Sequence, residues 1–178
     1  FKPLYGGMSG SDDEKRYYKA FLEKYKDIAK WHETLQSDAI QYKKVKLPSG
    51  REYSFPYAQR QAWGGSSYST QIKNYPVQGF ATADIVPIAC INAYKMMKDK
   101  DVKSLLINTV HDSIVVDAHP DEIETMTKLL DRATKDVIDS LYEFYKVEFN
   151  VPLDTELKVG ANWLEMQEIP IKINKVVL

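Results

Sequence analysis

Residues 11–43 alternate between apolar and polar positions with the period of an α-helix. Apolar side chains recur every three or four residues from Tyr17 to Leu35, and this spacing places them on one helix face. Ser11 and the three acidic residues after it suit a helix N-terminus, because they cap free amides and oppose the helix dipole. The pattern therefore predicts a helix over 11–43, broken once.

The next segments alternate between strand, loop and helix signals. Within residues 45–57, two short strand-like runs flank a Pro-Ser-Gly turn, which predicts a β-hairpin. The Gly- and Ser-rich stretch 62–71 predicts a loop and a boundary between two lobes. A mostly buried helix is expected from Gly79 or Ala81 to Lys98, and Pro87 should bend it or mark its first turn.

Residues 104–118 carry the strongest local signal. Two β-rich runs, "SLLINTV" and "SIVVDA", lie on either side of His111 and Asp112. This predicts a hairpin of two buried strands with the polar pair at its tip. An aspartate at such a tip can bind Mg²⁺, which takes few carboxylates. It can equally cap the turn, and the segment alone favours that structural role.

The C-terminal third predicts one long helix and two strands. Pro120 suits the first helical position and Asp121 and Glu122 the first turn, so we expect a helix over 120–146. Alternation over 151–160 predicts a strand, and 169–178 a final edge strand.

Composition narrows the class of protein. The chain has 178 residues, of which 44% are hydrophobic and 28% charged; this composition is typical of a globular protein and argues against disorder. Its first residue is Phe1 and its first methionine Met8, which suggests processing or a piece of something longer. Cys90 is the only cysteine, so no disulfide forms within the chain. The sequence contains no run of about 18 apolar residues, so it predicts no membrane span.

Charge and motifs exclude further classes. Residues 1–80 hold 13 Lys or Arg and 8 Asp or Glu, whereas residues 81–178 hold 11 and 17. A basic lobe beside an acidic one suits a polyanion next to a metal site, although two differently charged solvated surfaces explain it more simply. No Gly-rich phosphate loop occurs, and three histidines with one cysteine argue against a closed zinc site.

Four segments occur together in one order: "FKPLYGGMSG" (1–10), "NYPVQGFATADI" (74–85), "VHDSIVV" (110–116) and "VPLDTELKVGANW" (151–163). Together they resemble the C-terminal part of family A DNA polymerases, the DNA polymerase I group and its phage relatives. The N-terminal segment and the predicted hairpin over 45–57 look closer to phage enzymes than to bacterial ones. The resemblance implies an α+β fold. In this fold the palm is an antiparallel β-sheet packed on helices, and a helical remnant of the fingers accompanies it. It implies distal fingers over 1–68 and palm over 69–178, with the catalytic hairpin at 104–118.

The resemblance also implies roles for single residues. Phe1 would lie against the nucleotide sugar, Tyr5 would stack near the templating base, and Gly6 would belong to the same substrate site. Asn74 and Gln78 would contact template and primer in the minor groove, where acceptors lie at similar places in all base pairs. Two residues of the hairpin complete the site: His111 would contact the primer terminus, and Asp112 would be one of two metal-binding aspartates.

The implied activity is template-directed addition of dNTPs to a primer 3′-end with two Mg²⁺ ions, during DNA replication in a bacterial or phage-infected cytoplasm, with no membrane. Four features depart from the family. The upstream Asp-x-Ser-x-x-Glu motif and the triphosphate-binding Lys and Arg are absent. Ser113 stands where many relatives carry an acid, and Pro3 stands where bacterial relatives have an uninterrupted helix. We therefore predict little activity without an upstream polymerase polypeptide, in the same chain or as a split subunit. The alternative is a non-catalytic nucleic-acid-binding or assembly module with a polymerase-like fold.

Overall fold

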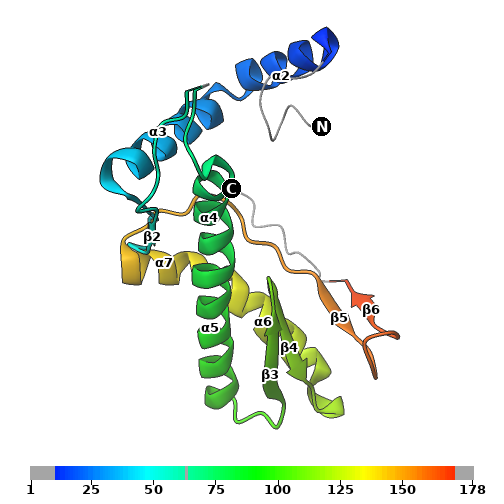
Figure 1. The fold of residues 1–178 in the computed structure, drawn as a ribbon. Helices are drawn as coiled ribbons and strands as arrows, with labels where there is room; N and C mark the ends of the chain where they lie inside the picture. The colour runs from blue at the N-terminus through cyan, green and yellow to red at the C-terminus, as the bar shows by residue number, and fades with distance from the viewer. Residues whose placement is uncertain (1–10, 63, 171–178) are drawn as a thin grey trace. The chain divides into compact units, whose positions relative to one another are not determined.

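The computed structural model describes residues 11–62 and 64–170, and it shows an α+β fold of helices and short antiparallel hairpins (Figure 1). The chain divides into two compact units, Phe1–Phe80 and Ala81–Leu178. The predicted nucleotide-site residues Phe1, Tyr5 and Gly6 lie outside the described residues.

The first unit begins with the predicted broken helix. α2 (Asp12–Lys24) and α3 (Lys26–Tyr42) are separated at Tyr25, whose ψ of 48° leaves the helical region. Ser11 forms a complete capping box: its Oγ accepts from the Glu14 amide at 3.3 Å, and the Glu14 carboxylate accepts from the Ser11 amide at 2.7 Å. Both the helix and its single break are confirmed.

The predicted hairpin at 45–57 is also confirmed. β1 (Lys44–Lys46) pairs antiparallel with β2 (Glu52–Ser54), with Val45 opposite Tyr53. Residues of α3, this hairpin and the helix after it form one apolar core: Leu35, Ala39, Val45, Phe55, Ala58 and Ile72.

The predicted loop over 62–71 is wrong in its last part. α4 (Ser69–Gly79) begins about ten residues before the expected helix start. Its buried residues Ile72, Pro76 and Gly79 are spaced by four and three, so one face enters the core although Asn, Pro and Gly are poor helix formers. Burial of this face therefore outweighed local propensity.

A π-helix, η1 (Phe80–Ile85), separates α4 from α5 (Val86–Asp99). Pro87 lies in the first turn of α5, as predicted. Proline has no amide hydrogen, so it cannot donate to the carbonyl of Ala83 as an uninterrupted α-helix requires. The change of helix type therefore falls where the backbone ladder must be interrupted.

In the second unit, β3 (Leu105–Val110) pairs antiparallel with β4 (Ser113–Asp117). Leu106 and Val116 pack against the apolar core that α5 forms with α6 (Ile123–Lys135). The other face is open, and Leu105 and Ile107 are 60% and 58% exposed. The hairpin is confirmed, but the prediction that both strands are buried is wrong, because only one face has a covering layer.

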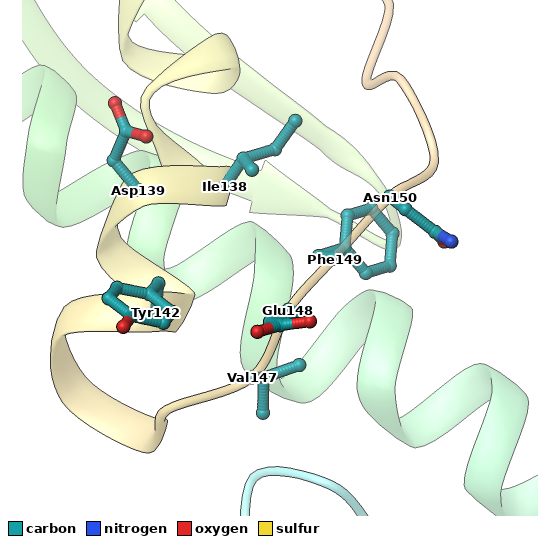
Figure 2. Close-up of a pocket in the computed structure, with 7 residues that line it drawn as sticks. All are labelled: Ile138, Asp139, Tyr142, Val147, Glu148, Phe149 and Asn150. Atoms are coloured by element: carbon teal, nitrogen blue, oxygen red, sulfur yellow. The ribbon is translucent and has the colours of Figure 1, made fainter.

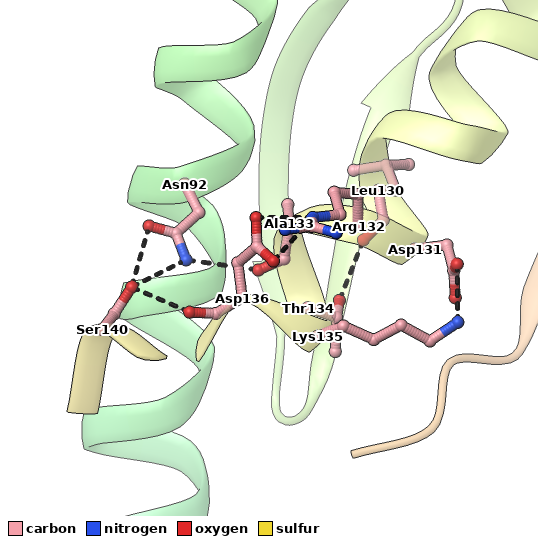
Figure 3. Close-up of polar contacts among 9 residues, drawn as sticks. All are labelled: Asn92, Leu130, Asp131, Arg132, Ala133, Thr134, Lys135, Asp136 and Ser140. Carbon is pink, nitrogen blue, oxygen red and sulfur yellow. Dashed lines mark hydrogen bonds and ion pairs between the residues drawn. The ribbon is translucent and has the colours of Figure 1, made fainter. Parts of the chain in front are cut away.

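The predicted helix 120–146 is three pieces: η2 (Pro120–Glu122), α6, and α7 (Val137–Tyr145), with a break at Asp136. The Asn92 side-chain amide of α5 donates to the Ala133 carbonyl oxygen at 3.3 Å and to Ser140 Oγ at 3.1 Å (Figure 3). A side chain that enters the helix ladder in this way bends or ends a helix. The continuous helix was therefore a wrong prediction with a tertiary cause.

The last two strands are short and pair with each other. β5 (Leu157–Val159) pairs with β6 (Gln167–Ile169), and the pairing covers only these three-residue segments. The predicted strand 151–160 is therefore confirmed only in its last third. Of the predicted final strand, 171–178 lie outside the described residues.

Candidate functional site

His111 and Asp112 form the two-residue turn of the β3–β4 hairpin. Val110 and Ser113 are the last pair of the ladder, and Ser113 Oγ donates to the Val110 carbonyl oxygen at 2.8 Å. His111 has a φ of 54°, a left-handed conformation that tight hairpin turns require. Both side chains are exposed, so the predicted presentation of the polar pair at the tip is confirmed.

Asp112 is available as a ligand. Its carboxylate makes no hydrogen bond or ion pair with any other residue that the structure describes. No group of three or more His, Cys, Asp or Glu side chains among the described residues could hold a metal ion. Asp112 therefore fits Mg²⁺ as a single carboxylate ligand, since Mg²⁺ is usually held by one or two carboxylates plus water and phosphate.

The opposite end of the hairpin is held by a hydrogen-bonded carboxylate. Glu122 accepts from the Lys103 amide at 2.9 Å, the Ser104 amide at 2.9 Å and Ser104 Oγ at 2.7 Å. These bonds, first that from Lys103 and then that from the Ser104 hydroxyl, lower the pKa of Glu122 to about 2. Sequence reasoning assigned Glu122 only to a helix first turn, because its partners lie 18 and 19 residues away.

Asn74 and Gln78 lie one helical turn apart on α4, and both are exposed. Gly79 lies on the buried side, where an added Cβ would overlap the Tyr53 ring of β2. The Tyr53 and Tyr75 rings lie 5.5 Å apart. The β1–β2 hairpin thus packs closely on the helix that carries Asn74 and Gln78.

The predicted residues fall into two groups. Asn74 and Gln78 belong to the first unit, and His111 and Asp112 belong to the second. Within the second unit, Asp117 lies at the far end of β4 from the tip and pairs with Leu105, so it is not a second ligand beside Asp112.

A shallow groove of about 270 Å³ lies between α7 and the segment that follows it (Figure 2). Its walls include the carboxylates of Asp139 and Glu148 and the rings of Tyr142 and Phe149. None of the predicted site residues lines it, so it is separate from the candidate site.

Comparison with known proteins shows the family to which this chain belongs. The model of DNA polymerase family A matches residues 9–165. DNA polymerase I of Lactococcus lactis subsp. lactis is 29% identical over 154 residues, which cover 86% of this chain and 16% of that protein. The DNA polymerase of Bacillus phage SP01 is 26% identical, over 93% of this chain and 18% of that protein. This chain therefore belongs to DNA polymerase family A.

Solved structures agree on the fold. The POL domain of Pol1 from M. smegmatis, in complex with DNA primer-template and dNTP, matches with a TM-score of 0.64 and 20% sequence identity. The match covers 75% of this chain and 24% of that one. This chain therefore spans less than a quarter of each of these two relatives and of that solved chain.

Proposed function

We propose that this chain is the C-terminal part of a template-directed DNA polymerase that adds dNTPs to a primer 3′-end during DNA replication. The observation that carries the proposal is the His111–Asp112 turn, exposed at the tip of a hairpin in a chain of DNA polymerase family A. Residues 1–68 would be distal fingers and 69–178 palm. The setting would be the cytoplasm of a bacterium or of a phage-infected host.

Each predicted residue keeps one role in this proposal. Asp112 would hold metal, and His111 would contact the primer terminus. The amides of Asn74 and Gln78 lie on an exposed stretch of α4 and would donate to minor-groove acceptors, which checks base-pair geometry without reading sequence. Phe1, Tyr5 and Gly6 would contribute to the nucleotide site.

Magnesium is the metal that this ligand chemistry favours. When bound, two Mg²⁺ ions activate the attacking hydroxyl and stabilise the leaving group of a nucleotidyl transfer. The chain's own contribution is an exposed carboxylate in the two-residue turn of the hairpin, and an exposed imidazole next to it.

We further propose that the active enzyme needs a polypeptide outside these 178 residues. The sequence holds no Asp-x-Ser-x-x-Glu motif, and the described residues offer no cluster of three metal-binding side chains. The partner would carry the second metal-binding aspartate and the triphosphate-binding Lys and Arg. It would be joined to this chain or supplied as a split subunit.

A primer-extension assay tests the proposal. In the complete polymerase, Asp112→Asn should abolish nucleotide addition and leave the Kd for primer-template within about twofold. Asp117→Asn is the matched control, because Asp117 is also exposed but lies at the other end of β4. Near-wild-type turnover of Asp112→Asn would contradict the metal-ligand role. Robust extension by the isolated chain would contradict the need for a partner.

A second candidate is a non-catalytic module that binds nucleic acid and retains the fold. Ser113 at the hairpin tip and the excess of basic residues over 1–80 favour it. This candidate predicts salt-dependent DNA binding through phosphate contacts, and Asp112→Asn should leave that binding unchanged. It also predicts no primer extension, whether the chain is assayed alone or together with an upstream polypeptide. The genomic sequence upstream of Phe1 discriminates most cheaply: an open frame with Asp-x-Ser-x-x-Glu supports the enzyme.

A further inference from the structure

We propose that Glu122 is a positioning residue for the His111–Asp112 turn, and that its carboxylate fixes the base of the β3–β4 hairpin to the start of α6. The proposal rests on the proposed function only for the role of the turn in catalysis. We use the name latch for the contacts that Glu122 makes with Lys103, Ser104 and His119, all of which lie in the second unit.

The first half of the latch holds β3. Glu122 lies at the junction of η2 and α6. Its Oε1 accepts from the Lys103 amide at 2.9 Å, and its Oε2 accepts from the amide and hydroxyl of Ser104 at 2.9 and 2.7 Å. Lys103 and Ser104 come directly before the first residue of β3, so the carboxylate holds the entry of that strand.

The second half holds the exit of β4. Ser104 Oγ accepts from the His119 amide at 3.0 Å, and the Glu122 amide donates to the His119 carbonyl oxygen at 2.9 Å. His119 follows β4 by two residues. Ser104 is only 3% exposed, so little water competes for these bonds. The three residues therefore tie both strands and the helix start into one ring.

The distance from base to tip makes the latch important. β3 has six residues, which at about 3.3 Å each make the hairpin about 20 Å long. A tilt of about 5° at the base would move the tip by about 2 Å over that length. Misplacement of a catalytic group by about 1 Å can cost about a hundredfold in rate.

The far half of the hairpin is covered only in part, since Ile114 and Val115 of β4 are half-buried. Leu106 and Val116, near the base, pack against the core. Beyond the register shift between Leu106 and Asn108, the β3 residues Asn108, Thr109 and Val110 are exposed. On the β3 side the orientation of the tip therefore depends on the base, where Glu122 acts.

The charges around the carboxylate agree with this role. Hydrogen bonds from Lys103 and Ser104, and a smaller attraction to His119, keep Glu122 ionised by lowering its pKa to about 2. Asp121 lies beside His119 instead, with its Oδ2 3.7 Å from His119 Nδ1. Charge-assisted bonds of this kind are shorter and stronger than neutral ones.

Residual dipolar couplings of the 178-residue chain test the latch directly. Glu122→Ala should change the couplings of the β3–β4 amides relative to those of α6, and should speed exchange of the His119 amide at least tenfold. Glu124→Gln is the matched control: it removes the same charge two residues away, from an exposed ion pair with Lys128, and should change neither. Wild-type couplings in Glu122→Ala would overturn the proposal.

Kinetics in the complete polymerase test the positioning role. Glu122→Gln and Ser104→Ala should each lower kcat at least tenfold, whereas KM for dNTP and Kd for primer-template should stay within twofold of the wild-type values. The assay temperature is kept well below the thermal unfolding midpoint of each variant. An unchanged kcat despite altered couplings would overturn the positioning role. If the wild-type enzyme extends no primer, the proposed function fails, and the couplings alone decide whether the latch exists.

Discussion

At the scale of single residues, contacts between segments distant in the sequence shape this structure more than local secondary-structure propensity does. Gly79 ends α4 against the Tyr53 ring, and Glu122 reaches back to Lys103 and Ser104. Each contact can be changed by one substitution with a clear expected sign.

Gly79→Ala should lower the free energy of unfolding by about 1–3 kcal/mol, because the new Cβ overlaps the Tyr53 ring. In a Tyr53→Leu background the overlap is relieved. The same change should then stabilise the chain by up to about 1 kcal/mol, since alanine is a better helix former than glycine. Urea unfolding of the four variants measures this reversal of sign, and an equal effect in both backgrounds would contradict the contact.

The pKa of Glu122 predicts a specific acid sensitivity. Folding lowers this pKa from 4.5 to about 2, so the folded state is stabilised above pH 4.5 and loses that stabilisation as the pH falls toward about 2. Glu122→Gln should remove this component, and its urea midpoint should fall less than that of the wild type over this range. Glu124→Gln should retain most of the wild-type pH dependence, because exposed ion pairs contribute little. Parallel curves for the wild type and Glu122→Gln would refute the latch.

At the scale of elements, a polar contact divides one helical pattern into two helices. Residues 120–146 keep an apolar face throughout, yet α6 ends before Asp136. There Asn92 contacts Ala133 and Ser140 (Figure 3), and Ser140 Oγ also donates to the Asp136 carbonyl oxygen at 3.0 Å. The break therefore depends on a residue from another helix.

Asn92→Leu should cost about 1–3 kcal/mol of stability, because it leaves the partly buried Ser140 hydroxyl and Ala133 carbonyl without this donor. Lys95→Ala, at an exposed position of the same helix, should stay within about 0.5 kcal/mol. Combining Asn92→Leu with Ser140→Ala should cost less than the sum of the two. Thermal unfolding measures all four variants, and strict additivity would argue against the contact.

At the scale of the molecule, the apolar side chains are unevenly buried. The first unit gathers its core around α3, the β1–β2 hairpin and α4, whereas α2 buries none of its residues. Across the described residues, large apolar side chains such as Tyr17, Phe21 and Ile107 are exposed. No helix of the described part is long and apolar enough to cross a membrane.

This distribution predicts a large contrast between two phenylalanines of the first unit. Phe55 is 6% exposed and Phe21 is 45% exposed. Phe55→Ala should therefore lower the free energy of unfolding by about 3–5 kcal/mol, and Phe21→Ala by less than about 1 kcal/mol. Urea unfolding of the isolated chain compares them, and equal losses would mean that the core extends to α2.

Local patterns predicted the features that depend on neighbouring residues. The Ser11 cap, the broken helix over 11–43 and the turn at His111 and Asp112 need only contacts within a few positions. The start of α4 was missed because Ile72 is held in a core built by α3 and β1. The bulge at Ile107 was missed because one extra residue in a strand leaves no periodic signal but changes which face later residues occupy.

By itself the sequence determined the family, the α+β class and the exposed polar tip at His111 and Asp112, because ordered motifs and short-range turn chemistry are written in consecutive residues. Only the tertiary structure decided which hairpin face is covered, where the helix over 120–146 breaks, and that Glu122 holds the base of the hairpin. The covered face depends on apolar packing of Leu106 and Val116 against α5 and α6, and the other two outcomes depend on hydrogen bonds between residues 18 to 48 positions apart. No periodicity records such pairs, since each becomes favourable only when the packed elements bring its two partners together.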